Sequence, residues 1–365
     1  MPFPPILAGY YAGWGAGRYP VANIPAGQLT HVLYAFAAVS AQGECVAEDP
    51  AQDVPNFQAL AQLKQADPAL QVLISVGGWS GSGRFSDVAA TAAARAHFAD
   101  SCAAFLKAHG FDGLDVDWEF PVSGGLPANH YRPDDSQNFT ALLAELRRAL
   151  DAQGQADGRH YALTIAAPAG PSEYGHLELA VIHPYLDWIN LMTYDFYTAA
   201  SPTTNFNGAL FASPADPAPA RARTHNADAA VQAYLAAGVP ARKLVLGAAL
   251  YGRGWQGVPA ANDGLYQPDS GPAHGTYADD GVFSYPDLVD HYLPTYTRHF
   301  QPDAREPWLY NPATGIFITY EDPESMGLKA DYALAHDLGG MMFWELSLDD
   351  EQHALVNALH AHLNP

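Results

Sequence analysis

The stretch FDGLDVDWEFP, residues 111–121, places four acidic side chains within eight residues of an otherwise apolar run. Side chains two residues apart in an extended strand point the same way. Asp115, Asp117 and Glu119 therefore share one face of the expected strand, and the apolar residues between them share the other. Carboxylates crowded into apolar surroundings cost folding energy and shift one another's pKa values, as functional sites do. The stretch predicts a buried strand with a functional acidic face.

The same kind of strand recurs along the chain, separated by stretches with helical periodicity. Eight such runs are found, at residues 6–11, 30–39, 71–79, 111–120, 161–169, 187–196, 243–255 and 339–347. Eight strand-helix units are typical of the (β/α)8 TIM barrel, an α/β fold whose active site lies at the carboxyl ends of the strands. Glu119 stands at that end of the fourth strand. One helix is expected to start near Asp134 and to end at Gly154.

One connection is too long for a simple barrel. Between the seventh and eighth strands about 60 residues intervene where one helix would suffice. They contain a helical piece at 285–293 and a hairpin at 307–320. We therefore expect a small α+β insertion domain at residues 256–318, standing as a wall beside the strand ends, and a barrel formed by residues 1–255 and 319–365.

Composition narrows the choice of partners. The formal charge of −22 repels nucleic acid and anionic membrane surfaces, so neither is expected as a partner. No apolar run approaches the roughly 20 residues that cross a bilayer. The N-terminal sequence shows no basic region followed by a long apolar core, so no signal peptide is visible.

Cys102 and Asp112 are expected to be structural. Cys45 and Cys102 do not make a disulfide framework, and Cys102 shares a helical stripe with apolar residues, which favours a buried thiol. Asp112, early in the acidic strand, is expected to cap a turn or to bond backbone near Gly113.

Five motifs resemble those of glycoside hydrolase family 18, the chitinases and their relatives. DGLDVDWE is similar to the family's D-G-x-D-x-D-x-E signature, and LISVGGWS to its S-x-G-G motif on the third strand. The others match the sixth, seventh and eighth strands. In chain order the five lie at residues 73–80, 112–119, 190–196, 250–255 and 339–346. The insertion also resembles that of a chitinase subfamily with deep clefts.

The resemblance implies a retaining mechanism in which the substrate assists the reaction. This mechanism sets the family apart from most glycosidases, which use two carboxylates. Glu119 would be the general acid and base, and the substrate's own 2-acetamido oxygen the nucleophile. Asp117 would orient the acetamide N–H and stabilise its developing charge, Asp115 would bias Asp117, and the Tyr194 hydroxyl would hold the acetamide carbonyl.

The resemblance also implies a set of substrate-binding residues. Trp344 would form the apolar floor beneath the cleaved sugar, and Asp195 would be a further sugar contact. The remaining positions that would line the cleft or support the acidic strand are Met192, Tyr10, Trp79, Phe36, Tyr251, Arg253 and Ser75. No cofactor and no metal are implied.

Alternatives remain open at this stage. By themselves, the three carboxylates of the acidic strand are also ligands suited to Ca²⁺ or Mg²⁺. A chitin-binding, chitinase-like lectin and an endo-β-N-acetylglucosaminidase acting on N-glycans share parts of the signature. The leading expectation is a chitinase acting on chitin or chitooligosaccharides, monomeric and, from its function, secreted.

Overall fold

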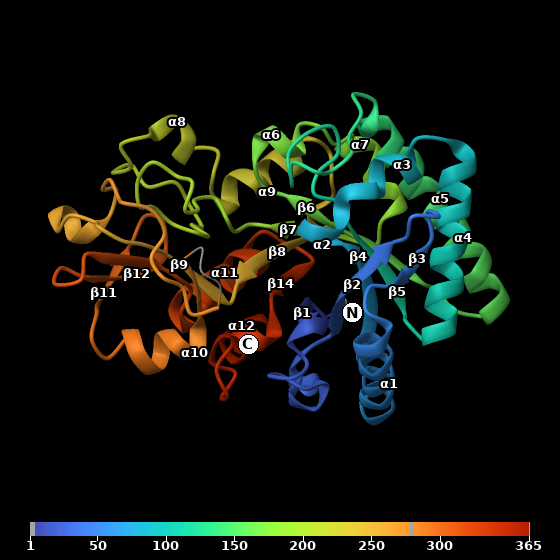
Figure 1. The fold of residues 1–365 in the computed structure, drawn as a ribbon, viewed down its shortest axis with the longest axis horizontal. Helices are drawn as coiled ribbons and strands as arrows, with labels where there is room; N and C mark the ends of the chain where they lie inside the picture. Colours follow the sequence, from blue (N-terminus) through green and yellow to red (C-terminus); the bar gives the residue numbers. More distant parts are fainter. Residues whose placement is uncertain (1–3, 278–280, 365) are drawn as a thin grey trace.

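Eight parallel strands close into a barrel in the computed structural model, which describes residues 4–277 and 281–364 (Figure 1). The order around the barrel is β1-β14-β8-β7-β6-β5-β4-β2, and pairing of β1 with β2 closes it. This confirms the predicted fold and all eight barrel strands. The strands are β1 (Ile6–Ala12), β2 (His31–Val39), β4 (Gln71–Gly77), β5 (Gly113–Asp117), β6 (Ala162–Pro168), β7 (Trp188–Met192), β8 (Leu244–Ala249) and β14 (Gly340–Trp344). A short strand, β3 (Cys45–Ala47), pairs antiparallel with β2.

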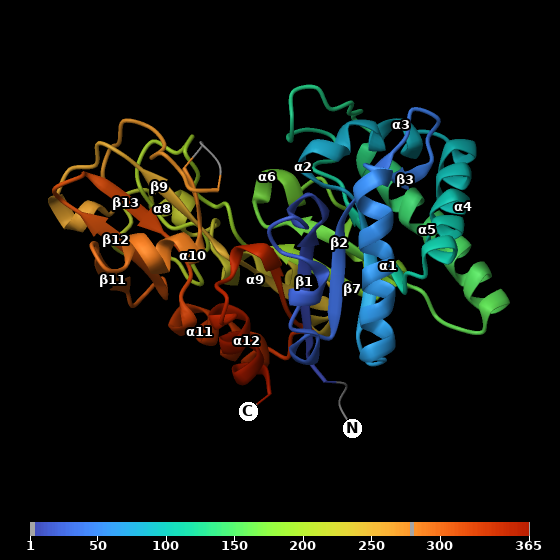
Figure 2. The same ribbon diagram turned by 60° about the horizontal axis from the view of Figure 1, so that its bottom comes forward.

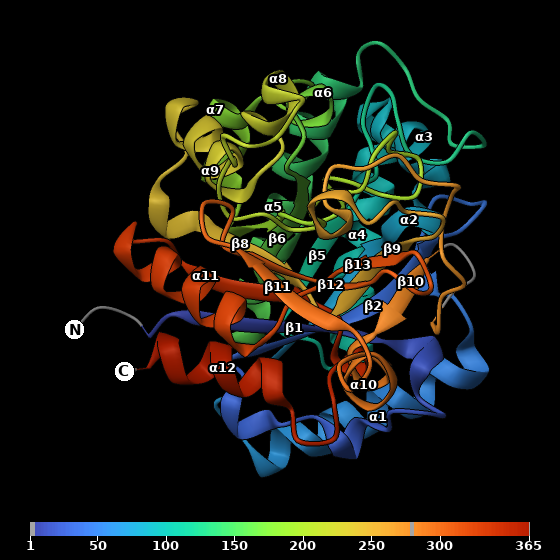
Figure 3. The same ribbon diagram turned by 90° about the vertical axis from the view of Figure 1, so that its left-hand side faces the viewer.

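Helices cover the outside of the barrel. The longer ones are α1 (Pro50–Ala66), α4 (Ala92–His109), α5 (Asp135–Asp157), α9 (Ala227–Ala236), α11 (Pro323–Ala335) and α12 (Ala354–Leu363). Short helices sit in the connections: α2 (Gly78–Gly81), α3 (Phe85–Ala89), α6 (Pro171–Tyr174), α7 (Leu179–Ile182) and α8 (Pro219–Ala222). Figure 3 shows α11 and α12 side by side. No helix within the described ranges is long and apolar enough to cross a membrane.

Two local details differ from the expectations. The connection from β1 to β2 consists of three 3-10 turns, without a regular helix, in a segment that contains Pro20 and Pro25; proline fixes its own φ and removes a backbone donor. The helix expected to end at Gly154 continues to Asp157 and is capped by Gly158, whose φ is +69°.

The barrel has a small interior core and a large outer one. Apolar residues of the interior group include Tyr10, Leu33, Trp188 and Met342. The outer core lies between strands and helices; Trp118, for example, stacks on Phe85 of α3 and meets Phe139 of α5 edge to face. Cys45 and Cys102 are buried free thiols in this layer, as predicted for Cys102.

A second, antiparallel sheet stands beside the barrel (Figure 2). Its order is β10-β9-β13-β12-β11, with β9 (Tyr251–Trp255), β10 (Val282–Ser284), β11 (Thr297–Gln301), β12 (Glu306–Asn311) and β13 (Ile316–Thr319). The hairpin formed by β12 and β13 confirms the expected one. The expected helical piece is present as α10 (Tyr285–Asp287), followed by a π-helical turn, Leu288–Tyr292.

The seventh predicted strand was too long. Residues 243–255 divide at Leu250, so that β8 stays in the barrel and β9 joins the second sheet. The backbone N–H of Leu250 still bonds the carbonyl of Trp344, at 2.8 Å. A sequence run cannot reveal this change, because both halves have the same strand-type composition.

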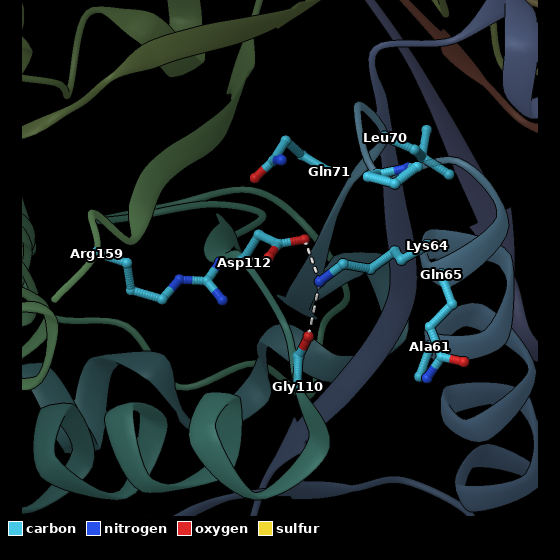
Figure 4. Close-up of a pocket in the computed structure, with 9 residues that line it drawn as sticks. Ala61, Lys64, Gln65, Leu70, Gln71, Gly110, Asp112 and Arg159 are labelled. Carbon is cyan, nitrogen blue, oxygen red and sulfur yellow. Dashed lines mark hydrogen bonds and ion pairs between the residues drawn. The ribbon is translucent and has the colours of Figure 1, made fainter. Parts of the chain in front are cut away.

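An open pocket of about 480 Å³ (Figure 4) is lined by residues at the amino ends of barrel strands, among them Asp112 just before β5 and Arg159 before β6. Asp112 is buried there, accepts a hydrogen bond from the backbone N–H of Val72 at 2.8 Å, and pairs with Lys64 and Arg159. Lys64 also donates to the carbonyl of Gly110. The buried carboxylate is thus satisfied by backbone and two cations, which confirms its expected structural role.

Candidate active site

Asp115 is the centre of a hydrogen-bond network inside the barrel. Its side chain is fully buried. One carboxylate oxygen accepts from Tyr10 (2.8 Å) and Ser75 (2.7 Å), and the other accepts from Thr164 (2.6 Å) and Asn190 (3.2 Å). Burial raises the pKa of Asp115, and these four hydrogen bonds oppose that rise by favouring the charged form. The network fixes the carboxylate from four different strands.

Asp117 lies one step closer to the strand end and has an unpartnered oxygen. The residue is buried, and among the described residues its Oδ1 has no hydrogen-bond partner. Burial, followed by the charges of Glu119 and Asp115, raises the pKa of Asp117 well above its usual range. A buried acceptor without a donor is costly, so this oxygen is suited to receive a donor from a ligand.

Glu119 stands just beyond the end of β5. Its backbone N–H donates to the hydroxyl of Ser82 at 2.8 Å, and its carbonyl accepts from Asn129 at 3.0 Å. Burial, together with the negative charge of Asp195, raises the pKa of Glu119 to about 8. A carboxylic acid that keeps its proton at neutral pH can serve as a general acid.

Two consecutive glycines bring β4 against this acidic segment. Gly77 has φ +108°, and a Cβ there would overlap the carbonyl oxygen of Asp117. Gly78 has φ +76°, and a Cβ there would lie 2.5 Å from the ring of Phe36. Both positions require a residue without a side chain, which gives a physical reason for the SVGG motif.

The segment around β7 supplies residues on the same inner face. Asn190 bonds Asp115, and Met192 and Tyr194 pack against the interior core. The three side chains alternate along the segment and all lie on the interior side. Burial raises the pKa of Tyr194 well above its usual range, with further contributions from neighbouring Tyr251 and the acidic groups. Its hydroxyl therefore stays protonated and can donate a hydrogen bond.

Asp195 is held by two side chains of the second sheet. Its Oδ1 accepts from the Tyr251 hydroxyl at 2.7 Å and from Arg253 Nε at 2.8 Å. The Arg253 guanidinium also lies 5.5 Å from the ring centre of Tyr251. Tyr251 and Arg253 were expected near the cleft, and the structure brings them to Asp195.

Aromatic rings form one surface of the site. Phe36 stacks on Trp344 with ring centres 5.7 Å apart, and Tyr10 lies 5.4 Å from Trp344. Trp14 lies 6.1 Å from both Phe36 and Trp344 and is 49% exposed. Trp79, in contrast, is 51% exposed on α2, and no ring contact joins it to this group in the described ranges.

Thr164 and Trp14 were missed by the sequence analysis. Thr164 on β6 and Ser75 on β4 are both paired in register with Asp115. The register of the barrel strands could therefore have indicated that Thr164 contacts Asp115. Trp14 lies two residues after the end of β1, and an aromatic residue just after a strand's carboxyl end was an available signal. Within residues 4–277 and 281–364 no group of three or more His, Cys, Asp or Glu side chains is arranged to hold a metal ion.

The arrangement combines a protonated acid, a buried unpartnered acceptor, a phenol and an apolar floor. Such a set can donate a proton to a neutral leaving group, hold a donor group of the substrate and pack against the apolar face of a ring.

The chain is similar to known proteins over almost its whole length. The family model described as "Glycosyl hydrolases family 18" matches residues 6–349 of this chain. Chitinase A1 of Niallia circulans is 42% identical over an alignment that covers 98% of this chain and 58% of that protein. Chitinase ChiA74 from Bacillus thuringiensis has a TM-score of 0.94 at 38% identity, covering 99% of this chain and 70% of that one. A family 18 N-acetylglucosaminidase from Paenibacillus barengoltzii has a TM-score of 0.86 at 35% identity, covering 98% of this chain and 99% of that one.

Proposed function

Because the chain belongs to family 18 of the glycosyl hydrolases, we propose that it hydrolyses the β-1,4 bonds between N-acetylglucosamine units of chitin and chitooligosaccharides. The single observation that supports this most is the raised pKa of Glu119, about 8, beside the buried and unpartnered Oδ1 of Asp117. The pair offers a proton and an acceptor at one end of the barrel.

In the first step Glu119 protonates the glycosidic oxygen. The acetamido oxygen of the same substrate attacks the anomeric carbon, and the bond to the leaving sugar breaks with its electron pair on the protonated oxygen. Proton donation of this kind contributes typically a hundredfold to ten-thousandfold to the rate. An oxazolinium-type ring results, with positive charge at the acetamide nitrogen.

Asp117 and Tyr194 then act on the acetamide group. The unpartnered oxygen of Asp117 accepts the acetamide N–H, and the buried carboxylate stabilises the positive charge. The Tyr194 hydroxyl donates to the acetamide oxygen and keeps it in line for attack. Asp115, fixed by four donors, supplies the negative charge beneath Asp117.

In the second step water attacks the anomeric carbon. Glu119, now ionised, takes a proton from this water, the ring opens, and the product keeps the original configuration. Trp344 packs against the sugar ring through both steps, together with Phe36 and Tyr10.

The test is hydrolysis of a tetramer of N-acetylglucosamine by the wild type and by Glu119→Gln. The variant keeps the size of the side chain and lacks the proton, so we expect a loss on the order of a hundredfold or more. Glu351→Gln, a matched change at an exposed carboxylate, serves as control. A Glu119→Gln enzyme with most of the wild-type rate would remove Glu119 from its role; binding of the tetramer by the wild type without cleavage would point to a lectin.

We further propose that residues 256–318, which supply β10, β11, β12 and most of β13 to the second sheet beside β9, form an insertion domain that makes the substrate groove deeper, as in the resembling chitinase subfamily. A deeper groove encloses more sugars per binding event, which favours exo-type or processive release of disaccharide. The early product profile on chitin oligomers tests this, since random mid-chain cleavage would contradict it. We propose an extracellular, monomeric enzyme.

A further inference from the structure

The backbone of Asp195 is held in an uncommon conformation by Asn207. Asp195 has φ +57°, in the left-handed region that non-glycine residues seldom adopt. Its N–H donates to Asn207 Oδ1 at 2.9 Å, and the next N–H, of Phe196, donates to the Asn207 carbonyl at 3.1 Å. Asn207 is 1% exposed. One buried asparagine thus fixes the turn that aims the Asp195 carboxylate.

Asn207 is in turn tied to the second sheet. Its backbone N–H donates to the hydroxyl of Thr319 at 3.1 Å. Thr319 is paired in register with Arg253 across β13 and β9, and Arg253 Nε donates to the Asp195 carboxylate. The contacts form a closed ring from Asp195 through Asn207, Thr319 and Arg253 back to Asp195.

A buried ion cluster fixes the residue after Asn207. The N–H of Gly208 donates to Glu306 at 3.2 Å, and Glu306 pairs with Lys329, which also pairs with Glu321. All three charged side chains are essentially fully buried. A Cβ at Gly208 would lie 2.9 Å from a Glu321 carboxylate oxygen, so a larger residue here would have to displace a member of the ion cluster. The turn at 207–208 is therefore anchored at both of its residues.

We propose that Asn207 is a positioning residue for catalysis, which acts by holding Asp195 so that its carboxylate faces Glu119. The proposal rests on the proposed function, in which Glu119 is the acid, and adds a specific route by which the second sheet reaches the reaction. Through Thr319 the second sheet holds the Asp195 backbone, and through Tyr251 and Arg253 it holds the carboxylate.

The charged and titratable groups around Glu119 and Asp195 determine in which direction the pKa of Glu119 changes when Asp195 is displaced. Glu119 has Asp117 on its own segment and Asp195 and Tyr194 on the β7 side, while Tyr251 and Arg253 contact Asp195 from β9. The charge of Asp195 favours the protonated form of Glu119. If Asp195 turns away, Glu119 loses its proton at a lower pH.

The experiment measures kcat, KM and the pH dependence of kcat/KM on the tetramer of N-acetylglucosamine for Asn207→Ala. Misplacement of a group by about 1 Å can cost up to about a hundredfold in rate. We expect kcat to fall roughly tenfold with a smaller change in KM, and the alkaline limb of the kcat/KM profile to move to lower pH. Asn207→Asp keeps the Oδ1 acceptor and should recover part of the rate.

A double-mutant comparison separates positioning from stability. Asp195→Asn should move the alkaline limb in the same direction, and Asn207→Ala added to it should produce no further shift, because both changes act through one group. A lower melting temperature with an unmoved alkaline limb would overturn the proposal, as would additive shifts.

If Asn207→Ala does not fold, Thr319→Val replaces it, with Thr319→Ser as its control. Loss of the Thr319 hydroxyl should move the alkaline limb to lower pH, and an unmoved limb in a folded Thr319→Val enzyme would overturn the proposal.

The two proposals fail differently. If Glu119→Gln retains activity, the proposed function is wrong. If Glu119→Gln is inactive while Asn207→Ala and Thr319→Val keep the wild-type kcat and pH profile, only the positioning role is wrong.

Discussion

Replacing Glu119 by glutamine is expected to stabilise the protein at neutral and alkaline pH while it removes activity. The folded state raises the pKa of Glu119 from 4.5 to about 8, first through burial and then through the charge of Asp195. Between these two pH values the folded protein binds more protons at this group than the unfolded chain does. Stability therefore falls as pH rises through this window. Glutamine has the size of the protonated acid and no charge to lose.

The magnitude follows from the two pKa values. One pH unit of difference corresponds to about 1.36 kcal/mol, so the wild-type penalty is close to zero at pH 4. It reaches about 3 kcal/mol at pH 7 and about 5 kcal/mol above pH 8, where it stays constant. Glu119→Gln should remove this penalty and so gain stability in the same pattern.

The assay is urea unfolding of the wild type, Glu119→Gln and the exposed-site control Glu351→Gln at pH 4, 7 and 9. We expect the stability difference between Glu119→Gln and wild type to grow with pH, and that of the control to stay the same. A difference that is equal at all three pH values, or that shrinks as pH rises, would refute the reasoning.

Three other changes follow from the geometry. Asp115→Asn should lower the free energy of unfolding, measured in urea at pH 7, by about 1–3 kcal/mol. Two of the four groups that donate hydrogen bonds to the Asp115 carboxylate would then face an NH₂ group, which cannot accept them. Equal stability of the variant and the wild type would count against the network. Gly77→Ala should lower the free energy of unfolding by more than about 3 kcal/mol, since its Cβ would overlap backbone at φ +108°. Gly17→Ala, where nothing lies within 4 Å, is the matched control, and similar melting temperatures for the two would contradict the steric argument. Trp344→Ala should lower kcat/KM by roughly tenfold or more through lost apolar contact, and Trp344→Phe should recover much of it; a Trp344→Ala enzyme with wild-type kcat/KM would exclude the floor role.

The barrel could be predicted from sequence because its signals are local. Alternation along a strand depends only on neighbouring residues, so the shared face of Asp115, Asp117 and Glu119 follows from spacing of two. In this barrel, strands that follow one another in the chain also lie next to one another, so few topologies had to be considered. Asn190 and Tyr194 lie on the interior side with the same alternation.

Contacts between distant segments could not be predicted in this way. The division of residues 243–255 at Leu250 depends on which strand each half pairs with, and both halves have strand-type composition. Thr164 and Asn207 act through partners 49 and 12 residues away, and neither stands in a motif.

Glycine gave a misleading local signal in one helix. Gly154 was expected to end the helix, because glycine costs about 1 kcal/mol in a helix interior. In the structure the N–H of Arg159 bonds the carbonyl of Gly154, and a Cβ at Gly154 would overlap the carbonyl of Arg159. The glycine therefore permits a close approach of the returning chain, and the capping role falls to Gly158.

In the proposed mechanism Glu119 delivers a proton while the acetamide of the same sugar attacks the anomeric carbon. The most direct measurement compares hydrolysis of a chitooligosaccharide with that of the same oligomer whose reacting sugar bears a free amine, with binding of both confirmed by calorimetry. We expect the second compound to bind and not to be cleaved at that bond. Cleavage of both at equal rates would contradict it.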